Sequence, residues 1–340
     1  MLDGTGSAAE PWLLPYGSTA TAADIFYCFR LLLGRNPHRE EWRGHSARAG
    51  EDLPGVVASY LNSLEFSRRG LLEPSRTQAI RRARIEGFDI FVALDDAAVG
   101  KGVAGGSYEP EVTAVFRRLL RPGMGVLDLG ANIGYFTLLS ASIVGAAGYV
   151  LAIEPNPRNV RLLEASRRAN GFAQVTISQT AAGRDTGLLE LHSSYSNGTT
   201  SDLSDAPDAV LGAEIVACVR ADALLRRGRR IDLIKADVEG AEYNALLGCR
   251  QTIEDHHPVI VSEFSPGLMP GISGITGEDY LRWLIDQRYL ISTIQPDGSL
   301  RAADRNWRLV LDEYGARGVD HLDIVATPHP VRDSAKSRGS

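Results

Sequence analysis

The sequence has 340 residues and therefore room for more than one average domain. Hydrophobic residues make up 44% and charged residues 23%, an ordinary balance that excludes a mostly disordered chain. The formal net charge of −6 argues against a protein whose main role is to bind nucleic acid through its phosphates. The three cysteines are too few and too scattered for a disulfide framework or a zinc site, so we expect a cytosolic protein.

Neither a signal peptide nor a membrane span is expected. The first residues include Asp3 and Glu10 and lack the basic and apolar regions of a leader peptide. Residues 129–153 carry no charge, but Gly134 and Gly145 interrupt this run. We interpret it as a turn, a buried helix and a buried strand.

The first part of the chain is predicted to be helical. Residues 1–20 are rich in Gly, Ser, Ala and Pro, which predicts a flexible leader. Helices are predicted from Thr21 to the stop signal Gly34, over 40–48 and over 53–66. Residues 21–75 would then form a small all-α domain, followed by a charged connecting segment, 76–84.

Residues 86–328 alternate between strands and helices. Strands are predicted at 88–94, 126–129, 149–154, 175–177, 188–192, 215–219, 231–236, 259–264, 290–294 and 322–325. Helices are predicted at 110–120, 135–144, 158–169, 242–253 and 278–288. This order predicts an α/β fold, a doubly wound Rossmann-like sheet that is mostly parallel. The last two strands have no predicted helix between them, which indicates one antiparallel member, and residues 329–340 are expected to be a disordered tail.

The strongest motif begins at the strand 126–129. This strand carries Asp128 near its end, and Gly130 and Gly134 follow in a loop that opens a helix. Glycines let the backbone turn sharply and let a ligand come close. The next predicted strand ends in Glu154, where a carboxylate is placed to accept hydrogen bonds from ribose hydroxyls. The pattern predicts a nucleoside site.

The loop favours S-adenosylmethionine over a dinucleotide. The dinucleotide fingerprint has three glycines that bring a helix N-terminus to a pyrophosphate. Here Asp128 stands two residues before Gly130, and its charge repels a pyrophosphate. The same carboxylate suits the ammonium group of S-adenosylmethionine.

These residues resemble the FkbM family of S-adenosylmethionine-dependent methyltransferases. The similar segments are 126–134, 154–157, the lead-in at 108–111 and 121–123, and the run Ile231–Glu242; the resemblance extends over about 87–328. The resemblance implies a cofactor site formed by Glu109, Asp128, Gly130, Ala131, Asn132, Gly134, Tyr135, Phe136, Glu154, Pro155, Asn156 and Asp237. Members of the family mostly methylate hydroxyl groups of sugars, polyketides and related metabolites.

The helical N-terminal segment resembles a bacterial domain of unknown function that is often attached to glycan-building enzymes. Residues 32–37 and 61–66 carry this resemblance. We expect the segment to be a docking or packing appendage. Because the similar domain is often attached to glycan-building enzymes, we expect a saccharide acceptor and a role in polysaccharide biosynthesis.

Methyl transfer to a hydroxyl needs a positioned base. Asp237 is the first candidate and Glu239 the second, at the end of the strand 231–236 and in the following loop. Side chains alternate along a strand, so Lys235 lies on the same side as both acids and would keep a carboxylate charged or contact the acceptor. The alternative is that these three side chains form an ion pair and a helix cap.

Several weaker candidates remain open. Glu263 ends a strand and is either an acceptor ligand or an ordinary strand-end acid. The polar loop 196–201 is either part of the acceptor pocket or a surface loop, and His256 and His257 are expected in a solvated turn. Asp222 with Asp237 and Glu263 would suit a hard divalent ion, but their spacing does not demand one, and no metal is expected. Residues 180–183 lack the usual acid or amide for adenine, which leaves backbone groups or Asp185.

The sequence thus predicts a bacterial, cytosolic O-methyltransferase that uses S-adenosylmethionine. The expected acceptor is a sugar hydroxyl in a glycan, glycolipid or related intermediate. The alternatives are a polyketide or other secondary-metabolite hydroxyl, an amine, or a scaffold without catalysis. Nucleic acid is disfavoured as a partner because no basic stretch interleaved with aromatic residues is present.

Overall fold

The protein is described by a computed structural model, and its chain divides into two compact units, residues 1–78 and 79–340. The structure describes residues 17–69, 80–94, 96, 99–194, 197–202, 214–226 and 228–329. Most of the predicted leader and tail lie outside these ranges. Residues 18–20 are held by backbone hydrogen bonds to residues 50–53.

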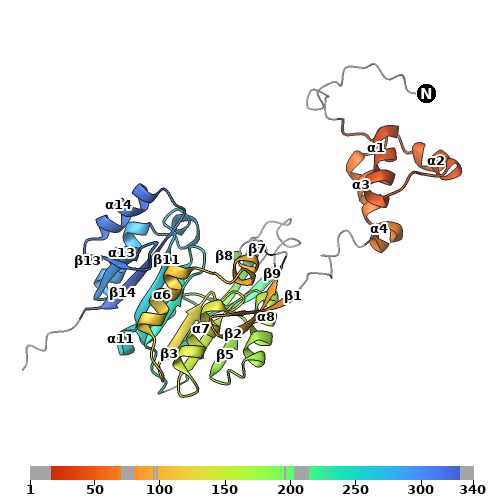
Figure 1. Ribbon diagram of the computed structural model, residues 1–340. Helices are drawn as coiled ribbons and strands as arrows, with labels where there is room; N and C mark the ends of the chain where they lie inside the picture. Colours follow the sequence, from red (N-terminus) through yellow and green to blue (C-terminus); the bar gives the residue numbers. More distant parts are fainter. Residues whose placement is uncertain are drawn as a thin grey trace, which may run out of the picture. The chain divides into compact units, whose positions relative to one another are not determined.

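The described part of the first unit contains only helices (Figure 1). They are α1 (Ala22–Tyr27), the π-helix η2 (Cys28–Leu33), α2 (Arg39–Ser46), α3 (Leu53–Leu61) and α4 (Leu64–Arg68). Thr21 caps α1 in a reciprocal pair with Asp24, and Gly34, at φ 69°, ends η2. The helix predicted over 53–66 is two helices, because the Ser63 hydroxyl accepts a hydrogen bond from Phe66 N and starts α4.

Arg35 joins three parts of this first unit. Its guanidinium donates hydrogen bonds to the carboxylates of Glu41 in α2 and Glu65 in α4. These bonds lower the pKa of Glu41 to about 2. The buried Phe29 ring packs beneath the Arg35 guanidinium and against Tyr60. One arginine therefore connects the helix ends around a small core.

The second unit is built on an eight-stranded sheet, in the order β13-β12-β14-β11-β10-β3-β4-β5 (Figure 1). Its strands are β3 (Gly125–Leu129), β4 (Tyr149–Ile153), β5 (Val175–Ser178), β10 (Leu233–Ala236), β11 (Val259–Phe264), β12 (Tyr289–Ile294), β13 (Leu300–Asp304) and β14 (Leu322–Pro328). The helices of this unit are α5 (Gly100–Ala104), α6 (Pro110–Leu119), α7 (Tyr135–Val144), α8 (Pro157–Ala169), α9 (Ala221–Leu224), α10 (Glu242–Leu247), α11 (Arg250–His256), α12 (Met269–Ile272), α13 (Gly277–Asp286) and α14 (Trp307–Arg317).

The antiparallel part of this sheet is larger than predicted. Strands β5, β4, β3, β10 and β11 are parallel, but β14 pairs antiparallel with both β11 and β12, and β12 with β13. The prediction of one antiparallel member is therefore wrong. Its premise is wrong as well, because β13 and α14 lie between the last two predicted strands.

Apolar side chains cover both faces of the sheet, as expected for strands with helices on each side. Val126 belongs to a core with α6, α7 and α8, and its neighbour Leu127 to a core with α11 and α13. Asp128 lies on the same face as Val126, because side chains alternate along a strand. Among the described helices, none has the length and apolar character needed to cross a bilayer.

Two smaller sheets complete the second unit. A hairpin joins β1 (Ile80–Ile85) to β2 (Phe88–Ala93), so the predicted connecting segment 76–84 is partly a strand. The other sheet has the order β6-β9-β7-β8. It consists of β6 (Ala181–Ala182), β7 (Gly187–Ser194), β8 (Asn197–Ser201) and β9 (Glu214–Val219).

Candidate active site

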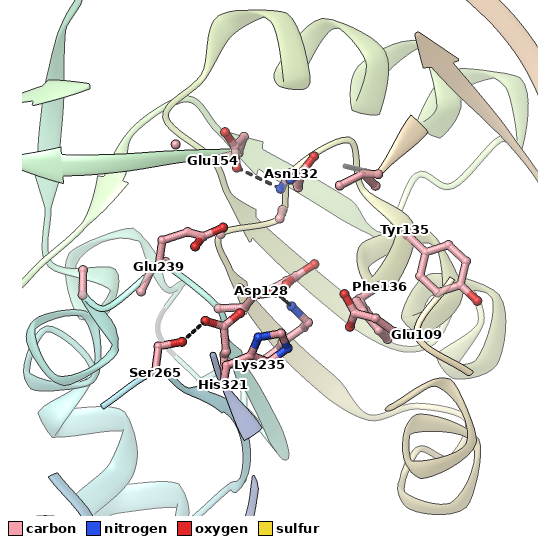
Figure 2. Close-up of a pocket in the computed structure, with 18 of the residues that line it drawn as sticks. Glu109, Asp128, Asn132, Tyr135, Phe136, Glu154, Lys235, Glu239, Ser265 and His321 are labelled. Atoms are coloured by element: carbon pink, nitrogen blue, oxygen red, sulfur yellow. Dashed lines mark hydrogen bonds and ion pairs between the residues drawn. The ribbon is translucent and has the colours of Figure 1, made fainter. Parts of the chain in front are cut away.

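A cavity of about 880 Å³ crosses the carboxyl ends of β4, β3, β10 and β11 in the second unit. Figure 2 shows Glu154 and Asn132 at one end of it and Lys235, Ser265 and His321 at the other. Open α/β sheets bind ligands at this edge. The fold thus brings together strand ends that are far apart in the sequence.

The glycine loop brings two strand ends into close approach. Gly130 has φ 79°, and a Cβ atom placed there would lie 1.8 Å from the backbone oxygen of Asp237. Gly134 has φ 95°, and its Cβ would meet the Leu163 side chain at 2.1 Å. Only glycine fits at either position. The predicted loop is therefore also the contact that sets Asp237 beside the end of β3.

Glu154 organises the β4 end of the cavity. Its carboxylate accepts hydrogen bonds from Asn132 N at 2.8 Å and from Asn156 N at 2.9 Å. Asn156 in turn caps α8 by accepting a bond from Arg158 N. Burial raises the pKa of Glu154 to about 7. Ala131 and Pro155, also predicted here, line the same cavity.

Asp128 is a buried acid with one oxygen unused. Its Oδ2 accepts a hydrogen bond of 2.5 Å from the Thr137 hydroxyl, while Oδ1 has no partner within the described part of the chain. Burial raises the pKa of this carboxyl. A buried, unpaired carboxylate oxygen in a cavity wall suits a ligand that donates hydrogen bonds, a cation above all.

Lys235 and Asp237 form the ion pair that the alternative interpretation anticipated. Lys235 Nζ lies 2.6 Å from Asp237 Oδ2 and 4.7 Å from the centre of the Phe136 ring. Burial opposes the positive charge, but Asp237 and Asp128 together raise the pKa of Lys235. Burial likewise opposes the negative charge on Asp237, yet Lys235 holds its pKa below the usual value. Asp237 therefore stays ionised inside the cavity.

Further acids surround this pair. Burial raises the pKa of Glu109 to about 7. Burial also raises the pKa of Glu239 above its usual value and that of Glu263 well above it, and the charge of Asp237 adds to both effects. The Ser265 hydroxyl donates a hydrogen bond to Glu263. Glu109 and Glu239 both have positive φ, 38° and 54°. Carboxyl groups thus dominate the β10–β11 side of the cavity.

Four further predicted residues line the cavity. Tyr135 and Phe136 line the cavity at the start of α7, and the Tyr135 hydroxyl pairs with the Thr113 hydroxyl. Gly198 and Thr200, from the polar segment 196–201, also line it, but from strand β8 rather than from a loop.

Other candidates lie away from the cavity. Asp222 accepts hydrogen bonds from Gln251 N and Thr252 N at the start of α11, apart from Asp237 and Glu263, so it does not share a metal site with them. His256 is part of α11, and its Nδ1 accepts a hydrogen bond from Ile231 N, so it is not in a solvated turn. Asp185 is not among the lining residues either.

Some lining residues were missed by the sequence analysis. They are Tyr108, Leu191, Ser265, Tyr314, Asp320 and His321, among others. Ser265 and His321 stand next to the ends of predicted strands, which is a usable signal. Leu191 carries no signal of its own, because only the pairing of the small sheet brings it to the cavity.

This combination of fold and site is methyltransferase-like: a mostly parallel central sheet whose first βα loop is glycine-rich and whose next strand ends in an acid. The family model described as the methyltransferase FkbM domain matches residues 128–315, more than half of the chain. The chain belongs to the FkbM methyltransferase family. The match begins at Asp128, so the helical first unit lies outside it.

Solved structures of methyltransferases also match the chain, at low sequence identity and with TM-scores below 0.5. A methyltransferase FkbM from Methylobacillus flagellatus is 17% identical with a TM-score of 0.41, over 90% of this chain and 60% of that one. A SAM-dependent O-methyltransferase from Thermotoga maritima is 14% identical with a TM-score of 0.37, over 66% and 68%. A precorrin-6y C5,15-methyltransferase from Geobacter metallireducens is 13% identical with a TM-score of 0.37, over 69% and 95%. The chain thus spans 60% of the length of the first of these proteins. No curated protein matches the sequence.

Proposed function

We propose that the protein is an S-adenosylmethionine-dependent O-methyltransferase that acts on a hydroxyl group of a sugar in a glycan, glycolipid or related intermediate. One observation carries the proposal. A single cavity joins an end lined by Glu154 and the glycine loop to an end that holds the Lys235–Asp237 ion pair. The FkbM family membership supports the same reaction class.

The residues present fit the proposed cofactor. The unpaired Oδ1 of Asp128 suits its ammonium group, and Glu154 suits the ribose hydroxyls. Gly130 lines the cavity, whereas Gly134, also predicted to bind the cofactor, does not line it and instead packs against Leu163 at the start of α7. Glu109, Ala131, Asn132, Tyr135, Phe136, Pro155 and Asn156 would complete the site. When bound, S-adenosylmethionine supplies an electrophilic methyl group.

The chain's own residues then handle the acceptor and its proton. The carboxylate of Asp237 would take the proton that the acceptor hydroxyl loses on methylation. Lys235 holds the other side of this carboxylate and keeps it ionised and oriented. Burial raises the pKa of Glu239, so Glu239 is the second candidate for the base.

The setting proposed for this reaction is the bacterial cytosol and polysaccharide biosynthesis. It rests on the cysteine content and on the resemblance of the helical segment. A polyketide or amine acceptor is the alternative within the same reaction class. A scaffold that has lost catalysis is a weaker alternative, because Asp128, Glu154, Lys235 and Asp237 all line the cavity together.

Calorimetric titration tests the cofactor first. S-adenosylmethionine and S-adenosylhomocysteine should bind with micromolar affinity, and NAD, as the control, should not bind. If neither adenosyl compound binds to the folded protein, the proposal is wrong. Saccharide acceptors are then screened by the mass increase of a methyl group.

The variant Asp237→Asn tests the base. We expect S-adenosylhomocysteine binding within about threefold of the wild type and a loss of roughly 100-fold or more in turnover, the usual scale for removing a general base. Glu239→Gln is the matched comparison and should lose less. Unchanged turnover of Asp237→Asn would exclude Asp237 as the base.

A further inference from the structure

The cavity has one wall that does not come from the main sheet. Leu191 of β7 and Gly198 and Thr200 of β8 line it, together with Ala181 and Ala182 of β6. Leu191 lies directly opposite Thr200 in the antiparallel β7–β8 pair, and Gly198 is two residues before Thr200. Because side chains alternate along a strand, these three residues share one face of the hairpin. That face is turned to the cavity.

The small sheet is attached on the Glu154 side. Two residues separate its strand β6 from the end of β5, and β5 is the neighbour of β4 in the main sheet. Glu154 N donates a hydrogen bond to Ser178 O at the end of β5. The hairpin therefore rises from the edge of the sheet next to Glu154. The charged side chains of β10 and β11 belong to the opposite end of the cavity (Figure 2).

The chemistry of this wall differs from that of the rest of the cavity. Pro155, Ala181, Ala182 and Leu191 are apolar, whereas the β10–β11 end carries Asp237 and its neighbouring acids. A purine base needs apolar contact on its faces and polar groups at its edge. Leu191 offers the larger apolar contact, Ala181 and Ala182 add little bulk to the wall, and Thr200 brings a hydroxyl to it.

We propose that the hairpin β7–β8 forms the adenine pocket, with Leu191 as the residue that covers the purine ring. The inference rests on the proposed cofactor and goes further, because it assigns adenine recognition to a sheet outside the doubly wound core. It names a specificity-determining residue, Leu191, that is only 3% exposed.

The same strand offers a matched control. Leu188 is on the opposite face of β7 and is 55% exposed. Leu191→Ala and Leu188→Ala remove the same atoms from the same strand, but only the first removes them from the cavity. Loss of apolar contact with a buried ring should weaken binding of S-adenosylhomocysteine by about tenfold or more in Leu191→Ala. Leu188→Ala should bind within twofold of the wild type.

A second ligand locates the contact along the cofactor. 5′-Methylthioadenosine has the adenosine part and lacks the amino-acid part. In competition titrations Leu191→Ala should lose affinity for it by the same factor as for S-adenosylhomocysteine. A loss confined to S-adenosylhomocysteine would place Leu191 at the amino-acid end and overturn the assignment.

Other outcomes are equally decisive. Wild-type affinity in Leu191→Ala, or an equal loss in both alanine variants, overturns the hairpin assignment and leaves the cofactor proposal intact. No binding by the wild type overturns both proposals. If Leu191→Ala fails to fold, Thr200→Phe tests the same wall, because a phenyl ring on the edge strand β8 would fill the space beside it. This variant should also bind S-adenosylhomocysteine at least tenfold more weakly, and unchanged binding contradicts the assignment.

Discussion

Gly130 and Gly123 have similar positive φ angles, 79° and 86°, but different surroundings. A Cβ atom at Gly130 would collide with the backbone of Asp237, whereas at Gly123 it would meet nothing within 4 Å. Gly130→Ala should therefore destabilise the second unit by several kcal/mol and abolish S-adenosylhomocysteine binding. Gly123→Ala should cost only about 1–2 kcal/mol, the strain of a left-handed residue with a side chain. Urea unfolding and calorimetry measure both effects.

This pair separates two roles of glycine. If Gly123→Ala is as damaging as Gly130→Ala, backbone strain explains both positions and the close approach of the two strand ends has no special importance. If only Gly130→Ala loses binding, the contact between the β3 loop and Asp237 holds the site together.

The site residues that could be predicted from the sequence are those that lie at the end of a strand. Asp128, Glu154 and Asp237 lie at or just beyond the ends of apolar runs, and parallel strands bring such ends to one edge. Leu191 lines the same cavity, but its position depends on the pairing of β7 with β8 and β9, which are distant from the main strand ends in the sequence. A sequence pattern records its own period and not the strand that will lie beside it.

At the scale of elements, Asp222 links two helices. Its carboxylate in α9 accepts bonds from Gln251 N, Thr252 N and the Thr252 hydroxyl, which satisfies the open N–H groups of the first turn of α11. Asp222→Ala should lower the free energy of unfolding by about 1–2 kcal/mol, as for loss of a helix cap. Glu254→Ala, on the exposed side of α11, is the control and should change it by less than about 0.5 kcal/mol.

Binding gives the second readout for Asp222. Because Asp222 does not line the cavity, Asp222→Ala should bind S-adenosylhomocysteine like the wild type. A requirement for a divalent ion that disappears in this variant would contradict the capping role and restore the metal interpretation.

Element boundaries show where sequence periodicity succeeds and fails. The helix predicted over 242–253 is broken between α10 and α11, where a Cβ on Gly248 would lie 2.1 Å from the Gly183 oxygen. That close approach is a tertiary demand, invisible in the helical pattern. By contrast, α14 was missed although its signals are present. Trp307, Val310, Leu311 and Tyr314 have helical spacing, and Gly318 follows the helix.

At the scale of the whole molecule, buried acids set the dependence of stability on pH. Burial raises the pKa of Glu109, Glu154 and Glu242 to about 7 and that of Asp323 to about 6, from ordinary values of 4.5 and 3.8. Between about pH 4.5 and 7 the folded state holds protons that the unfolded state has released. Stability is then greatest at the acidic side of this window and falls as the pH rises towards 7. Each such group contributes at most about 1.4 kcal/mol per pH unit.

Glu242 allows this expectation to be tested one group at a time. It is fully buried, and one of its oxygens accepts hydrogen bonds from Val238 N and Gly240 N. Glu242→Gln keeps the shape and removes the proton equilibrium, so the fall in unfolding free energy between pH 5 and pH 7 should become shallower. Glu254→Gln, an exposed acid, should leave the slope unchanged. If stability instead rises from pH 5 to pH 7 in the wild type, these acids are ionised in the folded protein.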